Sequence, residues 1–338
     1  MSWKAHGPLS TIATPSISCD RATEMAKRKV PERLYKYRTF SNRTLDALIA
    51  DQVFFADPST FNDPLDTKPT LDTDIDADAL AAILSRLVEQ RVNAEMSAAA
   101  KTIRYRGPKT ISHIAAHSRR RAEQVVAEIR YHATNPEYDI EDPARFLFGQ
   151  YVEEELLRRY GKGIFSLAER ADCPLMWSHY GDQHKGVCIG YSIPARAAGD
   201  LHKISYGGSR LIAASAVAAM LEGDEEARHQ VDEAVLTKKA VDWRYEREWR
   251  LVGPRGLHDS PLEMEEVVFG MRCSHAVKFA IVKALTGRSR PVRFYEIRER
   301  HGRFLLGRYT LDVDELSASL PRRALEMYDH FDDLSGEA

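Results

Sequence analysis

An uncharged run of strand length, residues 186–193 (GVCIGYSI), constrains the fold more than any other feature of this chain. Apolar residues follow one another here without the alternation expected of a strand that has one face in water, so the pattern predicts a strand buried on both faces. The chain is long enough for a sizeable core, since its 338 residues correspond, at roughly 150 residues per domain, to two units or one elaborated unit.

Shorter strand and helix patterns surround this run. Apolar or alternating segments predict strands at residues 34–38, 53–56, 164–167, 204–206, 243–252, 267–269, 292–297 and 304–309. Helical spacing predicts helices at residues 41–50, 142–159, 174–180, 274–284 and 313–330, and residues 211–236 are expected to be largely helical. Two more helices between residues 76 and 132 are interpreted as an insertion. Because strands and helices interleave irregularly, the predicted class is α+β, with a mixed, mainly antiparallel sheet, flanking helices and a helical insertion.

The same patterns divide the chain into three parts. Residues 1–30 show no apolar period and are expected to form a poorly ordered leader. Residues 31–311 form the α+β domain, with the helical insertion at about residues 72–150, and residues 312–338 form a C-terminal helix and tail. The longest uncharged apolar run, residues 211–221, is shorter than the ~20 residues that a membrane-spanning helix needs. With no secretory pattern either, we expect a cytoplasmic protein that does not enter the membrane.

The charge balance and the absence of common motifs argue against several classes of function. With 48 Lys+Arg and 50 Asp+Glu the net charge is -2, and the densest basic run, residues 119–121, is interpreted as a solvated helix face, so there is no strong nucleic-acid signal. The GxxxxGK[ST], GxGxxG, HExxH and GxSxG motifs are absent. The four cysteines include no CxxC pair, and the acidic run at residues 72–76 lacks the glycine and glutamate of a calcium loop, so no metal site is expected.

Four short blocks place polar or aromatic groups where strands end, and the first is residues 34–38. In a strand, Lys36 and Arg38 share one face while Tyr35 and Tyr37 share the other, so two cations and two aromatic rings are available to a ligand. The alternative interpretation is an edge strand that its charges protect from pairing.

The second block, residues 55–64, is a strand that runs into a loop with two prolines. A rigid loop of this kind can present Asn62 and Asp63 to a ligand. It can equally be a turn in which these side chains bond their own backbone.

The third block, residues 176–180, is aromatic and is followed by Lys185. Trp177, His179 and Tyr180 can line a pocket wall that stacks on a planar ring, with Lys185 near its end. The alternative is aromatic core packing around one satisfied histidine.

The fourth block, residues 243–251, carries two glutamates and an arginine at every second position. If the block is a strand, Glu246, Glu248 and Arg250 project from one face, and a carboxylate beside a guanidinium stays ionised and suits the stabilisation of a cationic transition state. The alternative is a surface ladder of cross-strand ion pairs.

In this order the blocks resemble a large, mostly bacterial family known as domain of unknown function 2971. The matching pieces are residues 34–38, 54–64, 165–191 and 239–251. The likeness extends over roughly residues 31–70 and 160–290, and it implies no assigned activity.

More weakly, the chain is similar to ADP-ribosyltransferases in its first strand with a polar residue between tyrosines, its second strand with a loop, and its late strand with a glutamate. The resemblance implies that NAD is the substrate and that Lys36 or Arg38 binds its ribose. It also implies that Glu248 binds the ribose 2′-hydroxyl and that Glu246 completes a paired-glutamate motif. The sequence departs from that plan where residues 59–61 (STF) replace a Ser-Thr-Ser element and where Lys36 replaces a histidine.

Two hypotheses follow. The first is an enzyme that cleaves NAD and transfers ADP-ribose to a macromolecular acceptor, as a toxin or phage-defence effector. The second is a non-catalytic module of a defence or stress system that binds a nucleotide or a partner protein at the same site. Both leave open whether Glu246 or Glu248 faces the pocket, because a one-residue bulge would separate them.

Overall fold

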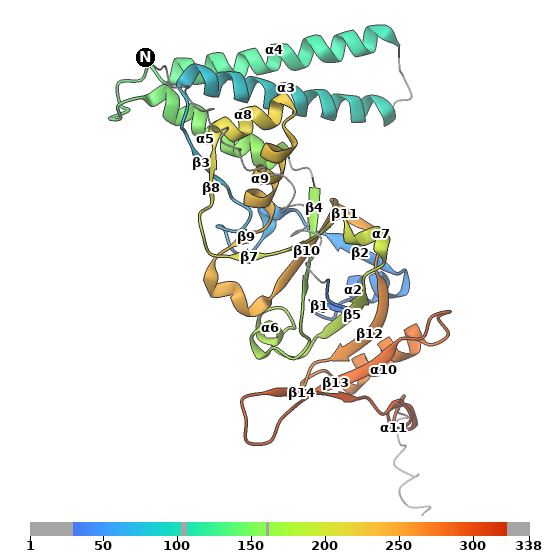
Figure 1. Ribbon diagram of the computed structural model, residues 1–338. Coiled ribbons are helices and arrows are strands. Elements are labelled where there is room, and N and C mark those ends of the chain that lie inside the picture. The colour runs from blue at the N-terminus through green and yellow to red at the C-terminus, as the bar shows by residue number, and fades with distance from the viewer. Residues whose placement is uncertain (1–29, 103–106, 160–161, 323–338) are drawn as a thin grey trace, which may run out of the picture. The chain divides into compact units, whose positions relative to one another are not determined.

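The computed structural model describes residues 30–102, 107–159 and 162–322 (Figure 1). The chain divides into two units, Met1–Glu32 and Arg33–Ala338, and the description below concerns the second. The expected leader falls almost entirely outside the described residues. No helix within the described ranges is both long and apolar enough to cross a membrane.

An eight-stranded sheet forms the centre of this unit. In spatial order its strands are β14 (Leu306–Thr310), β13 (Arg293–Glu299), β12 (Glu263–Phe269), β5 (Val187–Ser192), β1 (Leu34–Arg38), β4 (Lys162–Ala168), β10 (Glu248–Pro254) and β6 (Leu201–Lys203). Neighbouring strands are antiparallel except β12 and β13, which are parallel. The predicted α+β class with a mixed, mainly antiparallel sheet is confirmed.

Strand β5 lies inside the sheet between β12 and β1, and its residues from Val187 to Tyr191 are buried. The prediction from the uncharged run is therefore confirmed. A side chain at Gly186, just before the strand, would place its Cβ 2.2 Å from the carbonyl oxygen of Arg38 on β1. Glycine is needed here because the two backbones approach more closely than any Cβ allows.

Short helices and small sheets surround the main sheet. The helices are α2 (Asn42–Ile49), α6 (Pro174–His179), α7 (Ala195–Ala198), α10 (His275–Leu285), α11 (Val313–Ala318) and the 3₁₀ helices η1 (Pro58–Thr60) and η2 (Val241–Glu246). The small sheets pair β2 (Gln52–Phe55) with β11 (Gly256–Asp259), β3 (Thr70–Asp72) with β8 (Leu211–Ala213), and β7 (Ser205–Tyr206) with β9 (Lys238–Lys239). Ser41 and Ser274 cap α2 and α10, where each hydroxyl accepts a bond from a backbone N–H of the first turn.

A helical group shares a second core. Helices α3 (Ala77–Thr102), α4 (Pro108–His132) and α5 (Pro143–Arg159) come from the predicted insertion, and Figure 1 shows α3 and α4 running alongside each other. Helices α8 (Ala214–Glu222) and α9 (Glu225–Leu236), far along the sequence, pack into the same core through residues such as Val217 and Val231. That core lies around Leu84 and Leu87 of α3.

Three of the predicted elements are wrong at their ends. The strand expected at residues 243–252 begins only at Glu248, because η2 precedes it and Arg247 adopts a left-handed backbone with φ 44°. Residues 211–236, expected to be largely helical, do form helices α8 and α9, but the segment begins with the short strand β8, and the helices are separated at Gly223, whose φ is 98°. The terminal helix ends at Ala318, ahead of Pro321, since a proline disfavours helical backbone in the residue before it. The remainder of that predicted helix, beyond residue 322, lies outside the described residues.

Candidate functional site

Three acidic and two basic side chains meet at the start of β10, and we call them the carboxylate–cation cluster: Asp66, Lys239, Glu246, Glu248 and Arg250. They come from the loop after η1, from β9, from the end of η2 and from β10. The left-handed turn at Arg247 lets Glu246 and Glu248 approach the same cation, although one lies on a 3₁₀ helix and the other on a strand.

Arg250 is the innermost member, with a side chain that is 0% exposed. Its Nη2 lies 2.7 Å from both carboxylate oxygens of Asp66, and its Nε donates to Oε1 of Glu248 at 2.9 Å. Its Nη1 donates to the carbonyl of Leu236, the last residue of α9, at 2.8 Å. Such charge-assisted bonds hold the guanidinium in one orientation.

Lys239 joins the three carboxylates. Its Nζ lies 2.5 Å from Oε2 of Glu246, 2.9 Å from Oε2 of Glu248 and 3.4 Å from Oδ2 of Asp66. The same ammonium lies over the ring of Trp243, 5.2 Å from its centroid. Burial alone would lower the pKa of Lys239, but Glu248, Glu246 and Asp66 outweigh it and raise that pKa above its usual value.

The two glutamates are shifted in opposite directions. Burial acts to raise the pKa of both. For Glu248 the charges of Arg250 and Lys239 prevail and lower its pKa to about 2. For Glu246 burial prevails over the charge of Lys239, so its pKa is raised.

An aromatic group lies beside Glu246, and we define it as His179, Tyr180, Trp243 and Tyr245. The hydroxyl of Tyr180 donates to Oε1 of Glu246 at 2.8 Å. His179, at the exposed end of α6, lies 6.3 Å from Tyr245 and 6.5 Å from Trp243 between ring centroids. The group is part of the surface, since His179 is exposed and the other three rings are half-buried.

The predicted loop residues Asn62 and Asp63 hold this aromatic group in place. The amide of Asn62 donates to the hydroxyl of Tyr180 at 3.3 Å. The indole N–H of Trp243 donates to Oδ2 of Asp63 at 2.7 Å. The structure therefore brings together predicted residues from three of the four sequence blocks.

Lys36, from the first block, is half-buried on β1 beside the cluster. Its Nζ donates to the carbonyl of Ser166 at 2.9 Å and lies 4.9 Å from the centroid of the Phe165 ring. Burial, and then the charge of Arg38, lower its pKa to about 7, while Glu248 and Glu246 act in the opposite direction. Arg38 itself is half-buried at the end of the strand, and burial lowers its pKa.

Three other predicted residues lie elsewhere. Trp177 is fully buried, donates its indole N–H to the carbonyl of Ala171 at 2.8 Å and meets the ring of Tyr37 edge-on at 5.1 Å. Trp177 and Tyr37 are therefore core residues, because the inner face of α6 packs against β1. For Trp177 this is the alternative interpretation of the aromatic block. Lys185 is exposed in the loop between α6 and β5.

Sequence reasoning missed two members of the cluster. Lys239 lies within one of the pieces that resemble domain of unknown function 2971, but no pattern gave it a role. Asp66 sits in a turn with no distinguishing spacing, and only its position beside Arg250 identifies it. Among the described residues no group of three or more His, Cys, Asp or Glu could hold a metal ion.

Comparison with known proteins gives one match. A family described as protein of unknown function (DUF2971) matches residues 176–251, the segment that contains most of α6, Lys239, both glutamates and Arg250. This match supports the likeness to that family. No curated protein and no solved structure matches the chain.

Proposed function

We propose that the carboxylate–cation cluster cleaves the bond between nicotinamide and ribose in NAD and passes ADP-ribose to water or to a macromolecular acceptor, as a toxin or phage-defence effector would. One observation carries the proposal. Glu246 and Glu248 share the ammonium of Lys239, yet their pKa values are shifted in opposite directions. Neighbouring carboxyl groups whose environments separate their pKa values are typical of sites that use carboxylates in two different roles.

Glu246 is the carboxylate we assign to the reacting bond. Both oxygens of Glu248 bind cations, Arg250 and Lys239, whereas only one oxygen of Glu246 does, so we assign Glu248 as a positioning residue. Glu246 turns its Oε1 toward Tyr180 and the aromatic surface. When the C–N bond breaks, its electron pair leaves with nicotinamide, and the positive charge that develops on the ribosyl carbon is stabilised by a nearby carboxylate. Water or an acceptor then bonds to that carbon and gives its proton to Glu246.

The neighbouring residues supply the binding surface that such a substrate needs. The exposed face of the aromatic group is suited to stacking on the planar nicotinamide or adenine ring. Lys36 and Arg38, two residues apart on β1, are the cations closest to the cluster on that strand and would bind the pyrophosphate.

Release of nicotinamide tests the proposal. Purified protein is incubated with NAD, with and without cell extract as a source of acceptor, and free nicotinamide is measured by liquid chromatography. Glu246→Gln is expected to lose the activity while keeping its fold. Glu155→Gln is the matched control, because Glu155 is also a buried glutamate paired with an arginine, Arg91, but lies on α5. Absence of release by the unmodified protein under both conditions, or equal loss in both variants, would refute it.

A second candidate, a binding module without turnover, is favoured by a specific observation. The cations of the cluster are already bonded to its own carboxylates, as in a structural ion-pair network. Calorimetry with NAD and ADP-ribose that shows binding, together with no nicotinamide release, would support this function over the first.

A further inference from the structure

The hairpin of β13 and β14 concentrates positive charge in a chain that is slightly negative overall. Residues 288–310 contain seven arginines and two glutamates, whereas the whole chain has a net charge of -2. This segment lies outside residues 176–251, which match the family, and outside the carboxylate–cation cluster.

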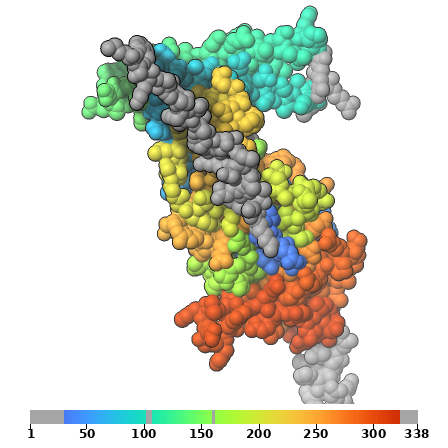
Figure 2. All heavy atoms as spheres, in the orientation of Figure 1, coloured from blue at the N-terminus to red at the C-terminus, as the bar shows by residue number. Residues whose placement is uncertain are grey.

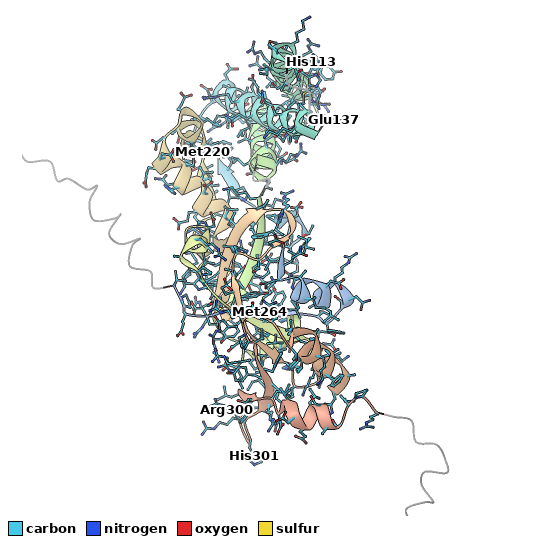
Figure 3. The ribbon with its side chains drawn as sticks, turned by 90° about the vertical axis from the view of Figure 1, so that its right-hand side faces the viewer. His113, Glu137, Met220, Met264, Arg300 and His301 are labelled. Carbon is cyan, nitrogen blue, oxygen red and sulfur yellow. The ribbon has the colours of Figure 1, made fainter. Side chains whose placement is uncertain are left out.

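The end of this hairpin is exposed, and we define the hairpin tip as Arg298, Arg300, His301, Arg303, Phe304 and Tyr309. All residues from Arg298 to Leu305 are exposed, and Phe304 is fully so. Figure 2 shows the hairpin protruding from the surface in orange. Figure 3 shows Arg300 and His301 at its turn, directed away from the sheet.

The arginines of the hairpin tip differ in their ion pairs. Arg300 and Arg303 form no ion pair with any residue in the described ranges. Arg298, by contrast, bonds to Glu296 at 2.6 Å and lies over the ring of Tyr309, 5.3 Å from its centroid. Phe304 follows Arg303 directly, so a fully exposed phenyl ring and exposed guanidinium groups lie on the same turn.

We propose that the hairpin tip binds a single-stranded polynucleotide. Guanidinium groups bind phosphate oxygens, and Arg298 at the end of β13 and Arg300 and Arg303 in the exposed turn that follows can contact the phosphates of one strand. An exposed aromatic ring stacks on an unpaired base regardless of its identity. The tip therefore combines the two contacts that single-strand binding uses, independently of the function proposed for the cluster.

A membrane surface fits the same residues less well. Interfacial anchors bury the long apolar face of a helix, whereas the tip offers Phe304 and the half-exposed Leu305 only. A paired duplex also fits less well, because its bases are stacked on each other and leave no free face for Phe304.

Fluorescence anisotropy with the full chain tests the proposal. The probes are labelled 20-nucleotide DNA and RNA strands of one mixed sequence, which distinguish the two sources of polynucleotide, and the same DNA as a duplex. Three phosphate contacts predict that affinity for a single strand falls about 20-fold between 50 and 200 mM salt. Removing the stacked ring in Phe304→Ala is expected to weaken binding about fivefold or more.

Arg300→Ala combined with Arg303→Ala should remove most of the binding. The matched control is Arg119→Ala combined with Arg120→Ala, which removes the same charge from the exposed face of α4. Thermal melting of each variant verifies the fold. No binding by the unmodified protein, equal loss in the control, preference for the duplex, or binding only to phosphatidylserine vesicles would each overturn the proposal.

Discussion

Replacing Arg250 by methionine is the sharpest test of how the carboxylate–cation cluster stabilises the fold. Methionine keeps the apolar stem of the side chain but removes the guanidinium, which is 0% exposed and bonds Asp66, Glu248 and the carbonyl of Leu236. Two carboxylates are then buried with Lys239 as their only remaining cation in the cluster.

The magnitude follows from the partners that are left. Breaking a buried ion pair by removing one partner costs about 3–5 kcal/mol, and the unpaired carbonyl of Leu236 adds about 1–3 kcal/mol. We therefore expect Arg250→Met to lower the free energy of unfolding by about 4 kcal/mol or more. At about 2–4 °C per kcal/mol for a domain of this size, the melting temperature should fall by about 10 °C.

Urea unfolding followed by circular dichroism measures this cost. The matched control is Arg130→Met, since Arg130 pairs with Asp78 at 2.8 Å but its side chain is 59% exposed, and exposed pairs contribute about 1 kcal/mol or less. If Arg250→Met costs no more than this control, the buried network does not stabilise the protein and the reasoning fails.

The pH dependence provides a second check on the same variant. Arg250 holds the pKa of Glu248 near 2, below the ordinary value of 4.5, so the pair stabilises the fold fully above pH 4.5 and loses that contribution as the pH falls toward 2. The difference in stability between the unmodified protein and Arg250→Met should therefore shrink over that range. A difference that stays constant from neutral to acid pH would show that the lost energy is not electrostatic.

Three further predictions concern neighbouring residues. Lys36→Met should stabilise the protein most at or below pH 7. The pKa of Lys36 is lowered from 10.5 to about 7, so the cost of burying its charge disappears as the pH rises from 7 toward 10.5. Urea unfolding at several pH values checks this. Gly186→Ala should destabilise the fold by about 1–3 kcal/mol or more, measured by thermal melting, because its Cβ would lie 2.2 Å from the carbonyl oxygen of Arg38. The hydrogen bond from Tyr180 lowers the pKa of Glu246 and so opposes the effect of burial. Tyr180→Phe removes this bond and should raise that pKa, so the acid limb of nicotinamide release should move to higher pH.

The fold was largely predictable because its signals are local. The uncharged run at residues 186–193 required a strand inside a sheet, and β5 is that strand. The helices expected at residues 41–50 and 274–284 likewise begin within one residue of the prediction, each directly after a serine that caps it. What could not be predicted is the joining of α8 and α9 to the insertion, because apolar helix faces do not specify which other faces they pack against.

The candidate site was predictable only in part, since it depends on a backbone irregularity. The alternation of Glu246, Glu248 and Arg250 suggested one strand face, and the side chains do converge. They converge through the left-handed turn at Arg247. The sequence does not predict this turn, because arginine seldom adopts a positive φ. Asp66 was missed because its role exists only once a distant loop is placed against β10.

The charge balance of the cluster explains why the pKa values of Glu246 and Glu248 are shifted in opposite directions. Three carboxylates face two cations, and the carbonyl of Leu236, at the negative end of α9, adds further negative potential beside Arg250. Arg250 binds Asp66 and Glu248, so among these cations only Lys239 opposes the burial of Glu246, and burial keeps the pKa of Glu246 raised. Glu246 is joined to the surface through Tyr180, whose hydroxyl donates to its Oε1. In the reaction that we propose, these ion pairs keep Glu248 ionised, and Glu246 is the carboxyl group that accepts the proton.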